Sequence, residues 1–154
     1  MKKNKVIAII LARGGSKGIP KKNVLNFAGH PLVAWTVIQA KASKEIDEVY
    51  ISSDSSEILE IAEKYGAKTI ERPLKISGDN AKSEEAIIHA LSILGSKQEM
   101  IIMLEPTAPL RKADDLDNCI KMFRNENWDS GFSGALLQDF LLWKKDKNGE
   151  LKSL

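Results

Sequence analysis

The chain has 154 residues, of which 43% are hydrophobic and 29% charged, and these proportions are typical of one globular domain. Its formal net charge of +2 is too small to indicate a nucleic-acid partner or an anionic membrane surface. One cysteine excludes a disulfide within the chain, and no apolar run approaches the roughly 20 residues that span a bilayer, so we expect a cytoplasmic protein.

The first predicted element is a buried strand over residues 6–12, and the loop after it is the most informative part of the chain. Residues 12–23 place three glycines among four cations. Glycine lets the backbone approach a ligand closely, and cations with free N–H groups bind a polyanion. The spacing matches neither a Walker loop nor the dinucleotide fingerprint. Because open α/β sheets bind ligands at the carboxyl ends of their strands, a triphosphate site is favoured over a merely basic surface loop.

Helices and strands alternate through the next part of the chain. Pro31 is suited to the first position of its helix. Asp54 is expected to begin the second helix as its cap, with Glu57 three residues later as in a capping box. The predicted helices cover residues 31–44, about 54–65 and 83–94, and the predicted strands cover residues 48–53, 68–71 and 100–104.

The last part of the chain is predicted to contain a helix over residues 113–124, a strand over 130–137 and a hairpin turn at Asn148 and Gly149. The alternation of strands and helices predicts an α/β fold with a Rossmann-like, doubly wound, mostly parallel sheet. No repeat or internal linker divides residues 1–154, which are therefore expected to form one domain.

Four segments, which span most of the chain, together resemble the acylneuraminate cytidylyltransferases, or CMP-nonulosonic acid synthetases. They are LARGGSKGIPKKN (residues 11–23), VYISSD (49–54), RPLKISGDNAKS (72–83) and LEPTAPLR (104–111). The resemblance implies a fold of the nucleotide-diphospho-sugar transferase type. It also implies that the chain is a nucleotidyltransferase domain that lacks the C-terminal portion of the family and most of its dimerisation extension.

The implied reaction joins an acidic nine-carbon sugar to CMP: its anomeric hydroxyl attacks the α-phosphorus of CTP, and pyrophosphate leaves. The resemblance further implies a requirement for Mg²⁺, whose carboxylate ligands would lie beyond Leu154, and a homodimer for a full-length member. Three alternatives stay open at this point. They are a truncated CTP-binding domain without activity, an enzyme similar to CMP-Kdo synthetase, and a phosphate-binding regulatory module without base preference.

The resemblance also assigns site residues. Arg13, Lys17 and Lys22 are implied to be the catalytic cations on the triphosphate. Arg72 would donate to the cytosine ring, and a main-chain carbonyl near Ala81 would accept from its amine. The remaining nucleotide contacts are implied to be Leu11, Ala12, Gly14, Gly15, Asn23 and Ser83, and the sugar contacts Glu105, Thr107 and Arg111.

Several of these residues also have a purely structural interpretation. Arg72 could be a solvated loop residue, Ser83 a helix N-cap, and Arg111 a helix cap or a partner of Asp114. Glu105 stands where the family pattern has glutamine. Because an ionised carboxylate only accepts hydrogen bonds and repels an acidic sugar, Glu105 favours a related nonulosonic acid over sialic acid itself.

Overall fold

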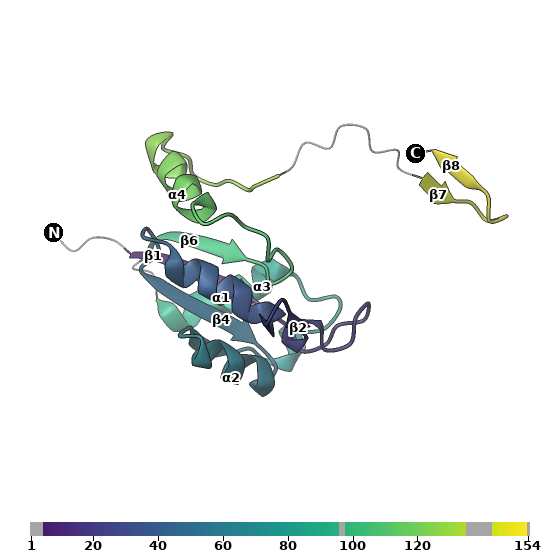
Figure 1. Ribbon diagram of the computed structural model, residues 1–154, viewed down its shortest axis with the longest axis horizontal. Coiled ribbons are helices and arrows are strands. Elements are labelled where there is room, and N and C mark those ends of the chain that lie inside the picture. Colours follow the sequence, from purple (N-terminus) through teal and green to yellow (C-terminus); the bar gives the residue numbers. More distant parts are fainter. Residues whose placement is uncertain (1–4, 96–97, 135–142, 154) are drawn as a thin grey trace.

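The computed structural model describes residues 5–95, 98–134 and 143–153. Its centre is a four-stranded sheet (Figure 1), whose strand order is β5-β4-β1-β6 and in which every neighbouring pair is parallel. The strands are β1 (Lys5–Leu11), β4 (Glu48–Ser53), β5 (Lys68–Glu71) and β6 (Gln98–Leu104). The chain thus extends the sheet on both sides of β1, which confirms the predicted doubly wound α/β fold.

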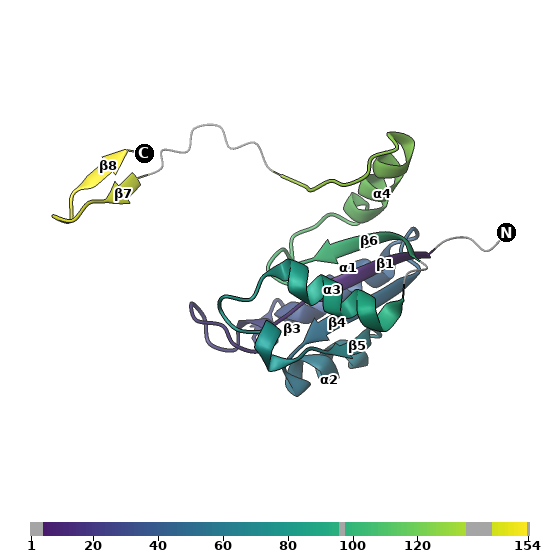
Figure 2. The ribbon, with the colours of Figure 1, turned by 180° about the vertical axis from the view of Figure 1, so that it is seen from behind.

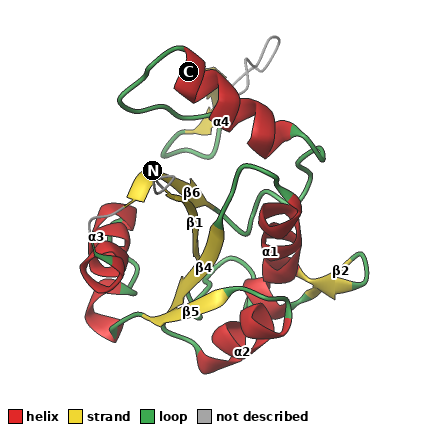
Figure 3. Ribbon diagram, turned by 90° about the vertical axis from the view of Figure 1, so that its left-hand side faces the viewer, coloured by secondary structure: helices red, strands yellow, loops and turns green. Residues whose placement is uncertain are grey.

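Helices cover both faces of this sheet. Figure 3 shows α1 (Leu32–Ala42) and α2 (Ser56–Lys64) on one face and α3 (Ser83–Leu94) on the other, and Figure 2 shows α3 from its own side. Successive side chains of β1 therefore enter different cores: Ala8 and Ile10 pack with α1 and α2, and Ile7 and Ile9 pack with α3. Burial on both faces explains why the central strand is continuously apolar.

The first helix begins one residue later than predicted. Pro31 has an extended conformation and pairs with Asn26 in a two-residue hairpin of β2 (Asn26–Phe27) and β3 (His30–Pro31). Ala28 and Gly29 form the turn with positive φ angles of 49° and 94°. The hairpin takes Pro31 out of the helix because its backbone has to remain extended for the pairing.

The third and fourth helices also differ from expectation at their first turns. Lys82 precedes α3 as its N-cap, and its N–H donates to Glu85 Oε2 at 3.1 Å, so the interpretation of Ser83 as the N-cap is wrong. The fourth helix, α4 (Asp115–Asn125), begins two residues later than predicted. Its Asp117 carboxylate accepts hydrogen bonds from Ser43 Oγ and from the Lys44 N–H, which fastens α4 to the end of α1.

The strand predicted over residues 130–137 is wrong for residues 130–134, and residues 135–137 lie outside the described part. Gly131 and Gly134 weaken strand formation, and Phe132 between them is almost fully exposed. The hairpin turn at Asn148 and Gly149 is confirmed, since it joins β7 (Trp143–Lys145) to β8 (Leu151–Ser153). Within the described segments, no helix is long and apolar enough to cross a bilayer.

Candidate nucleotide site

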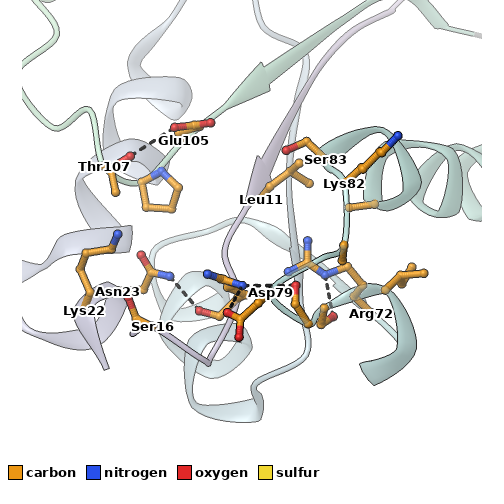
Figure 4. Close-up of a pocket in the computed structure, with 17 residues that line it drawn as sticks. Leu11, Ser16, Lys22, Asn23, Arg72, Asp79, Lys82, Ser83, Glu105 and Thr107 are labelled. Atoms are coloured by element: carbon orange, nitrogen blue, oxygen red, sulfur yellow. Dashed lines mark hydrogen bonds and ion pairs between the residues drawn. The ribbon is translucent and has the colours of Figure 1, made fainter. Parts of the chain in front are cut away.

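A cavity of about 400 Å³ lies where β1, β5 and β6 end. Its walls come from the loops after these three strands and from the first turns of α3, and parallel strands present such loops at one edge of the sheet. Figure 4 shows Lys22 and Asn23 on one side of the cavity, Arg72 and Lys82 on the other, and Asp79 between them. The lining residues are Leu11, Arg13, Ser16, Lys22, Asn23, Arg72, Ile76, Ser77, Gly78, Asp79, Ala81, Lys82, Ser83, Ala86, Glu105, Pro106 and Thr107.

The first wall is residues 12–24, here called the phosphate loop, which ends in the 3₁₀ helix η1 (Lys22–Val24). The Gly14 N–H donates to Asp54 Oδ1 at 2.9 Å, which ties the loop to the end of β4. A Cβ on Gly14 would lie 3.0 Å from Ser55 Cβ, closer than most such contacts, so this approach favours glycine. The prediction that Asp54 caps α2 is wrong: Ser55 is the N-cap, and the Asp54 carboxylate faces the phosphate loop.

Asn23 lies at the base of the phosphate loop and is only 6% exposed. Its Nδ2 donates to the Arg13 carbonyl oxygen at 2.9 Å, which fixes the start of the loop against η1. Its Oδ1 is buried and has no hydrogen-bond partner among the described residues. A buried acceptor without a partner carries a desolvation cost, so a ligand hydroxyl or amine that reaches it would gain a favourable hydrogen bond.

The three cations predicted to contact phosphate differ in their present partners. Asp79 Oδ1 lies 3.0 Å from Arg13 NH1, and Asp79 Oδ2 lies 2.7 Å from Lys17 Nζ. Lys22 lines the cavity and makes no ion pair with any residue that the structure describes. The hydrogen bond from Lys17, together with the nearby Arg13, lowers the pKa of Asp79, so its carboxylate is ionised at neutral pH.

The second wall is residues 72–83, here called the base loop, which contains the 3₁₀ helix η2 (Leu74–Ile76). Arg72 is 6% exposed, so its interpretation as a solvated loop residue is wrong. Its Nε donates to Ser77 Oγ at 3.0 Å, and its NH2 lies 3.9 Å from Asp54 Oδ1. Burial lowers the pKa of Arg72 while Asp54 opposes that shift, and a guanidinium stays protonated in such a setting.

The third side of the cavity is formed by the residues that follow β6. Thr107 Oγ1 donates to Glu105 Oε2 at 3.3 Å, and both side chains line the cavity. Arg111 lies outside the cavity and donates to Gln39 Oε1 and Thr36 Oγ1 of α1 and to the Glu105 carbonyl oxygen. Arg111 therefore holds the backbone that carries Glu105, and it neither caps a helix nor pairs with Asp114. Burial lowers the pKa of Arg111.

The structure thus brings most of the expected site residues to one cavity. The expected residues that line it are Leu11, Arg13, Lys22, Asn23, Arg72, Ala81, Ser83, Glu105 and Thr107. Those that do not are Ala12, Gly14, Gly15, Lys17 and Arg111. The main polar lining residues that the sequence did not single out are Ser16, Ser77, Asp79 and Lys82; the signal available for them was their position inside the same loop segments.

Known proteins resemble this chain in sequence. A family model described as cytidylyltransferase matches residues 7–140. The chain is 39% identical over 122 residues to an N-acylneuraminate cytidylyltransferase of Escherichia coli O18:K1:H7, covering 79% of this chain and 29% of that protein. It is 42% identical over 123 residues to a pseudaminic acid cytidylyltransferase of Campylobacter jejuni strain 81-176, covering 77% of this chain and 53% of that protein. The chain thus spans about half or less of these relatives' length.

Solved structures share the fold. A CMP:2-keto-3-deoxy-manno-octonic acid synthetase complexed with CTP matches with a TM-score of 0.69 at 19% identity, over 80% of this chain and 49% of that one. A 4-diphosphocytidyl-2C-methyl-D-erythritol synthase matches with a TM-score of 0.69 at 12% identity, over 100% of this chain and 70% of that one. The Rossmann-like nucleotidyltransferase architecture is therefore confirmed. Since the family model covers most of the sequence, the chain belongs to the cytidylyltransferase family.

Proposed function

We propose that this chain binds CTP and takes part in transferring its CMP group to an acidic nine-carbon sugar, with release of pyrophosphate. The observation that carries the proposal is one cavity that combines a cationic loop with a buried, fixed arginine on the facing wall. Two cytidylyltransferases at 39% and 42% identity act, by their names, on N-acylneuraminate and pseudaminic acid, which supports a nonulosonic acid as the sugar.

The phosphate loop would hold the triphosphate. Arg13 and Lys22 line the cavity, and Lys17 stands beside it on the same loop. In the proposed step the anomeric hydroxyl loses its proton to solvent and its oxygen forms a bond to the α-phosphorus, while the bond from that phosphorus to the pyrophosphate oxygen breaks. Negative charge gathers on the leaving pyrophosphate, so positioned cations would lower the barrier without a covalent intermediate on the protein.

The base loop would select cytosine. A guanidinium can donate to the O2 and N3 acceptors of cytosine, whereas uracil presents a donor at N3. Arg72 suits this task because Ser77 and Asp54 already fix its orientation, so little conformational freedom would be lost on binding. Ala81 and Ser83 lie along the same wall, where a main-chain carbonyl would accept from the cytosine amine.

We propose Mg²⁺ as the companion of CTP. Mg²⁺ in nucleotide sites is held largely by substrate phosphates and water, with one or two carboxylates. Among the described residues, no group of three or more His, Cys, Asp or Glu could hold a metal ion. No role for a described residue as a Mg²⁺ ligand is therefore included, and the proposed step is argued from the cations of the phosphate loop alone. A homodimer and a cytoplasmic location remain predictions from the sequence.

Calorimetric titration of the chain with CTP, in the presence of Mg²⁺, tests the proposal. We expect saturable binding of CTP that is about tenfold or more tighter than binding of UTP, since a wrong base leaves buried polar groups unpaired. ATP serves as the control for binding through the triphosphate alone. Equal affinities for the three nucleotides would contradict base selection, and absence of binding would contradict the nucleotide site in this chain.

A further inference from the structure

Asp79 places a negative charge at the position where a triphosphate would have to bind. Its two carboxylate oxygens contact Arg13 NH1 at 3.0 Å and Lys17 Nζ at 2.7 Å. Arg13 NH1 also donates to the Gly78 carbonyl oxygen at 3.2 Å. In the free chain, therefore, Asp79 of the base loop is the anionic partner of two of the four cations of the phosphate loop.

A ligand can replace these contacts at little cost in stability. The side chains of Asp79, Arg13 and Lys17 are 46%, 40% and 81% exposed, and ion pairs with this exposure contribute little to stability. Asp79 sits in a turn, between η2 and α3, that belongs to no helix or strand. A phosphate chain carries more charge and more acceptor oxygens than one carboxylate, so it competes well for the same two cations.

We propose that Asp79 is an affinity-determining residue of the nucleotide site: in the free protein its carboxylate stands in for a phosphate of CTP, and it is displaced when the triphosphate binds. This inference rests on the proposed function, because it requires Arg13 and Lys17 to contact the triphosphate. Displacement frees the turn of the base loop from the phosphate loop at the moment the nucleotide enters. The carboxylate therefore weakens the binding of every ligand that needs the two cations, and it leaves the binding of a ligand without phosphate unaffected.

The opposite role is distinguishable by the sign of one measurement. If Asp79 instead acted on the bound nucleotide, by holding the cations in place or by contacting Mg²⁺, its neutralisation would weaken the binding of CTP. A displaced carboxylate predicts that neutralisation strengthens CTP binding. The pKa of Asp79, which lies below its ordinary range because of Lys17 and Arg13, agrees with a carboxylate that is ionised and paired before any ligand arrives.

The test is Asp79→Asn, titrated calorimetrically with CTP, with inorganic tripolyphosphate and with cytidine. We expect CTP and tripolyphosphate to bind about threefold to tenfold more tightly than to the unaltered chain, and cytidine to bind equally. Asp129→Asn, the same change of charge at an exposed position outside the cavity, is the matched control and should alter none of the three affinities. Weaker or unchanged binding of both phosphate ligands would overturn the inference, as would an equal gain in the control.

A second measurement needs no ligand and separates this inference from the proposed function. The ¹³C chemical shift of the Asp79 carboxyl, followed against pH, should report a lowered pKa in the free chain and a rise of that pKa in Lys17→Met. An ordinary pKa in the unaltered chain would overturn the inference whatever nucleotides bind. Failure of CTP to bind at all, with the pKa lowered as expected, would contradict the proposed function instead.

Discussion

The two walls of the cavity each present an arginine, and the two arginines are held in opposite ways. Arg72 in the base loop is 6% exposed and has Ser77 and Asp54 as partners. Arg13 in the phosphate loop has a side chain 40% exposed and is paired with Asp79. Folding has fixed the first guanidinium, whereas the second can change partners. Under the proposed function, the base loop would supply selection by shape and the phosphate loop would supply charge-driven binding.

The largest effect is expected from removing Arg72, the arginine that folding holds in place. Arg72→Ala should lower the free energy of unfolding by about 1–3 kcal/mol, because Ser77 and Asp54 lose a buried charged partner. It should also abolish the preference for CTP over UTP. Urea denaturation measures the first effect, and calorimetric titration with both nucleotides measures the second.

Arg72→Lys is the matched variant for this position, since it keeps the charge and loses the planar fork of donors. It should recover part of the stability and none of the base preference. A ratio of CTP to UTP affinity that survives in Arg72→Ala would count against base recognition by this residue, even if the stability falls as expected.

An intermediate effect on CTP binding is expected from the lysines of the phosphate loop. Lys22→Ala should weaken CTP binding by about tenfold and Lys17→Ala by less, because Lys17 gives up its contact with Asp79 when it binds phosphate and Lys22 gives up no ion pair with a described residue. Both changes should alter the free energy of unfolding by less than about 0.5 kcal/mol. Titration with CTP and urea denaturation measure the two quantities.

Lys75→Ala is the control for the loss of one positive charge, since Lys75 is exposed in η2 and does not line the cavity. CTP affinity in this variant should match that of the unaltered chain. If Lys17→Ala and Lys22→Ala weaken CTP equally, the pairing with Asp79 does not influence binding, and the distinction within the phosphate loop disappears.

The smallest effect on nucleotide binding is expected from the third side of the cavity. Glu105→Gln should leave CTP affinity within about twofold, because Glu105 lies on neither of the two walls that would contact the nucleotide. Its carboxylate would instead meet the acidic sugar, so the relative rates of pyrophosphate release with N-acetylneuraminic and pseudaminic acid should change. Glu126→Gln, at the end of α4, is the control. An unchanged ratio of rates in Glu105→Gln would place Glu105 outside the sugar site.

The sequence predicted the central strands β1 and β6 well because each contains a continuous apolar run, and local pattern suffices to find such runs. It also predicted the two loops that form the cavity walls, since each directly follows a strand. It did not predict how the loops are tied together. The bond from Gly14 to Asp54 spans 40 residues and that from Arg13 to Asp79 spans 66, and no local propensity reports such pairings.

Two of the failed predictions concern residues that suit a helix start but have another role in the fold. Aspartate is a common helix cap, and Glu57 follows Asp54 at the spacing of a capping box. In the structure, however, the Asp54 carboxylate accepts a hydrogen bond from the Gly14 N–H and lies 3.9 Å from the Arg72 guanidinium. Pro31 has the right backbone for a helix start and is drawn into a hairpin instead. The tertiary contacts of Asp54 and the short hairpin at Pro31 each outweigh a local preference of about 1 kcal/mol.

Asp54 links the ends of three strands through one side chain, since it follows β4, accepts from Gly14 after β1, and lies within 3.9 Å of Arg72 after β5. For protein engineering this divides each wall into a fixed root and a variable tip. Residues 15–21 and 78–81 lie beyond the linked positions and beyond Ser77, which holds Arg72, so their composition can be redesigned while the root of each wall is kept. A change in affinity for the phosphate chain is therefore best sought at these tips, with Gly14, Asp54, Arg72 and Ser77 left unchanged as the frame.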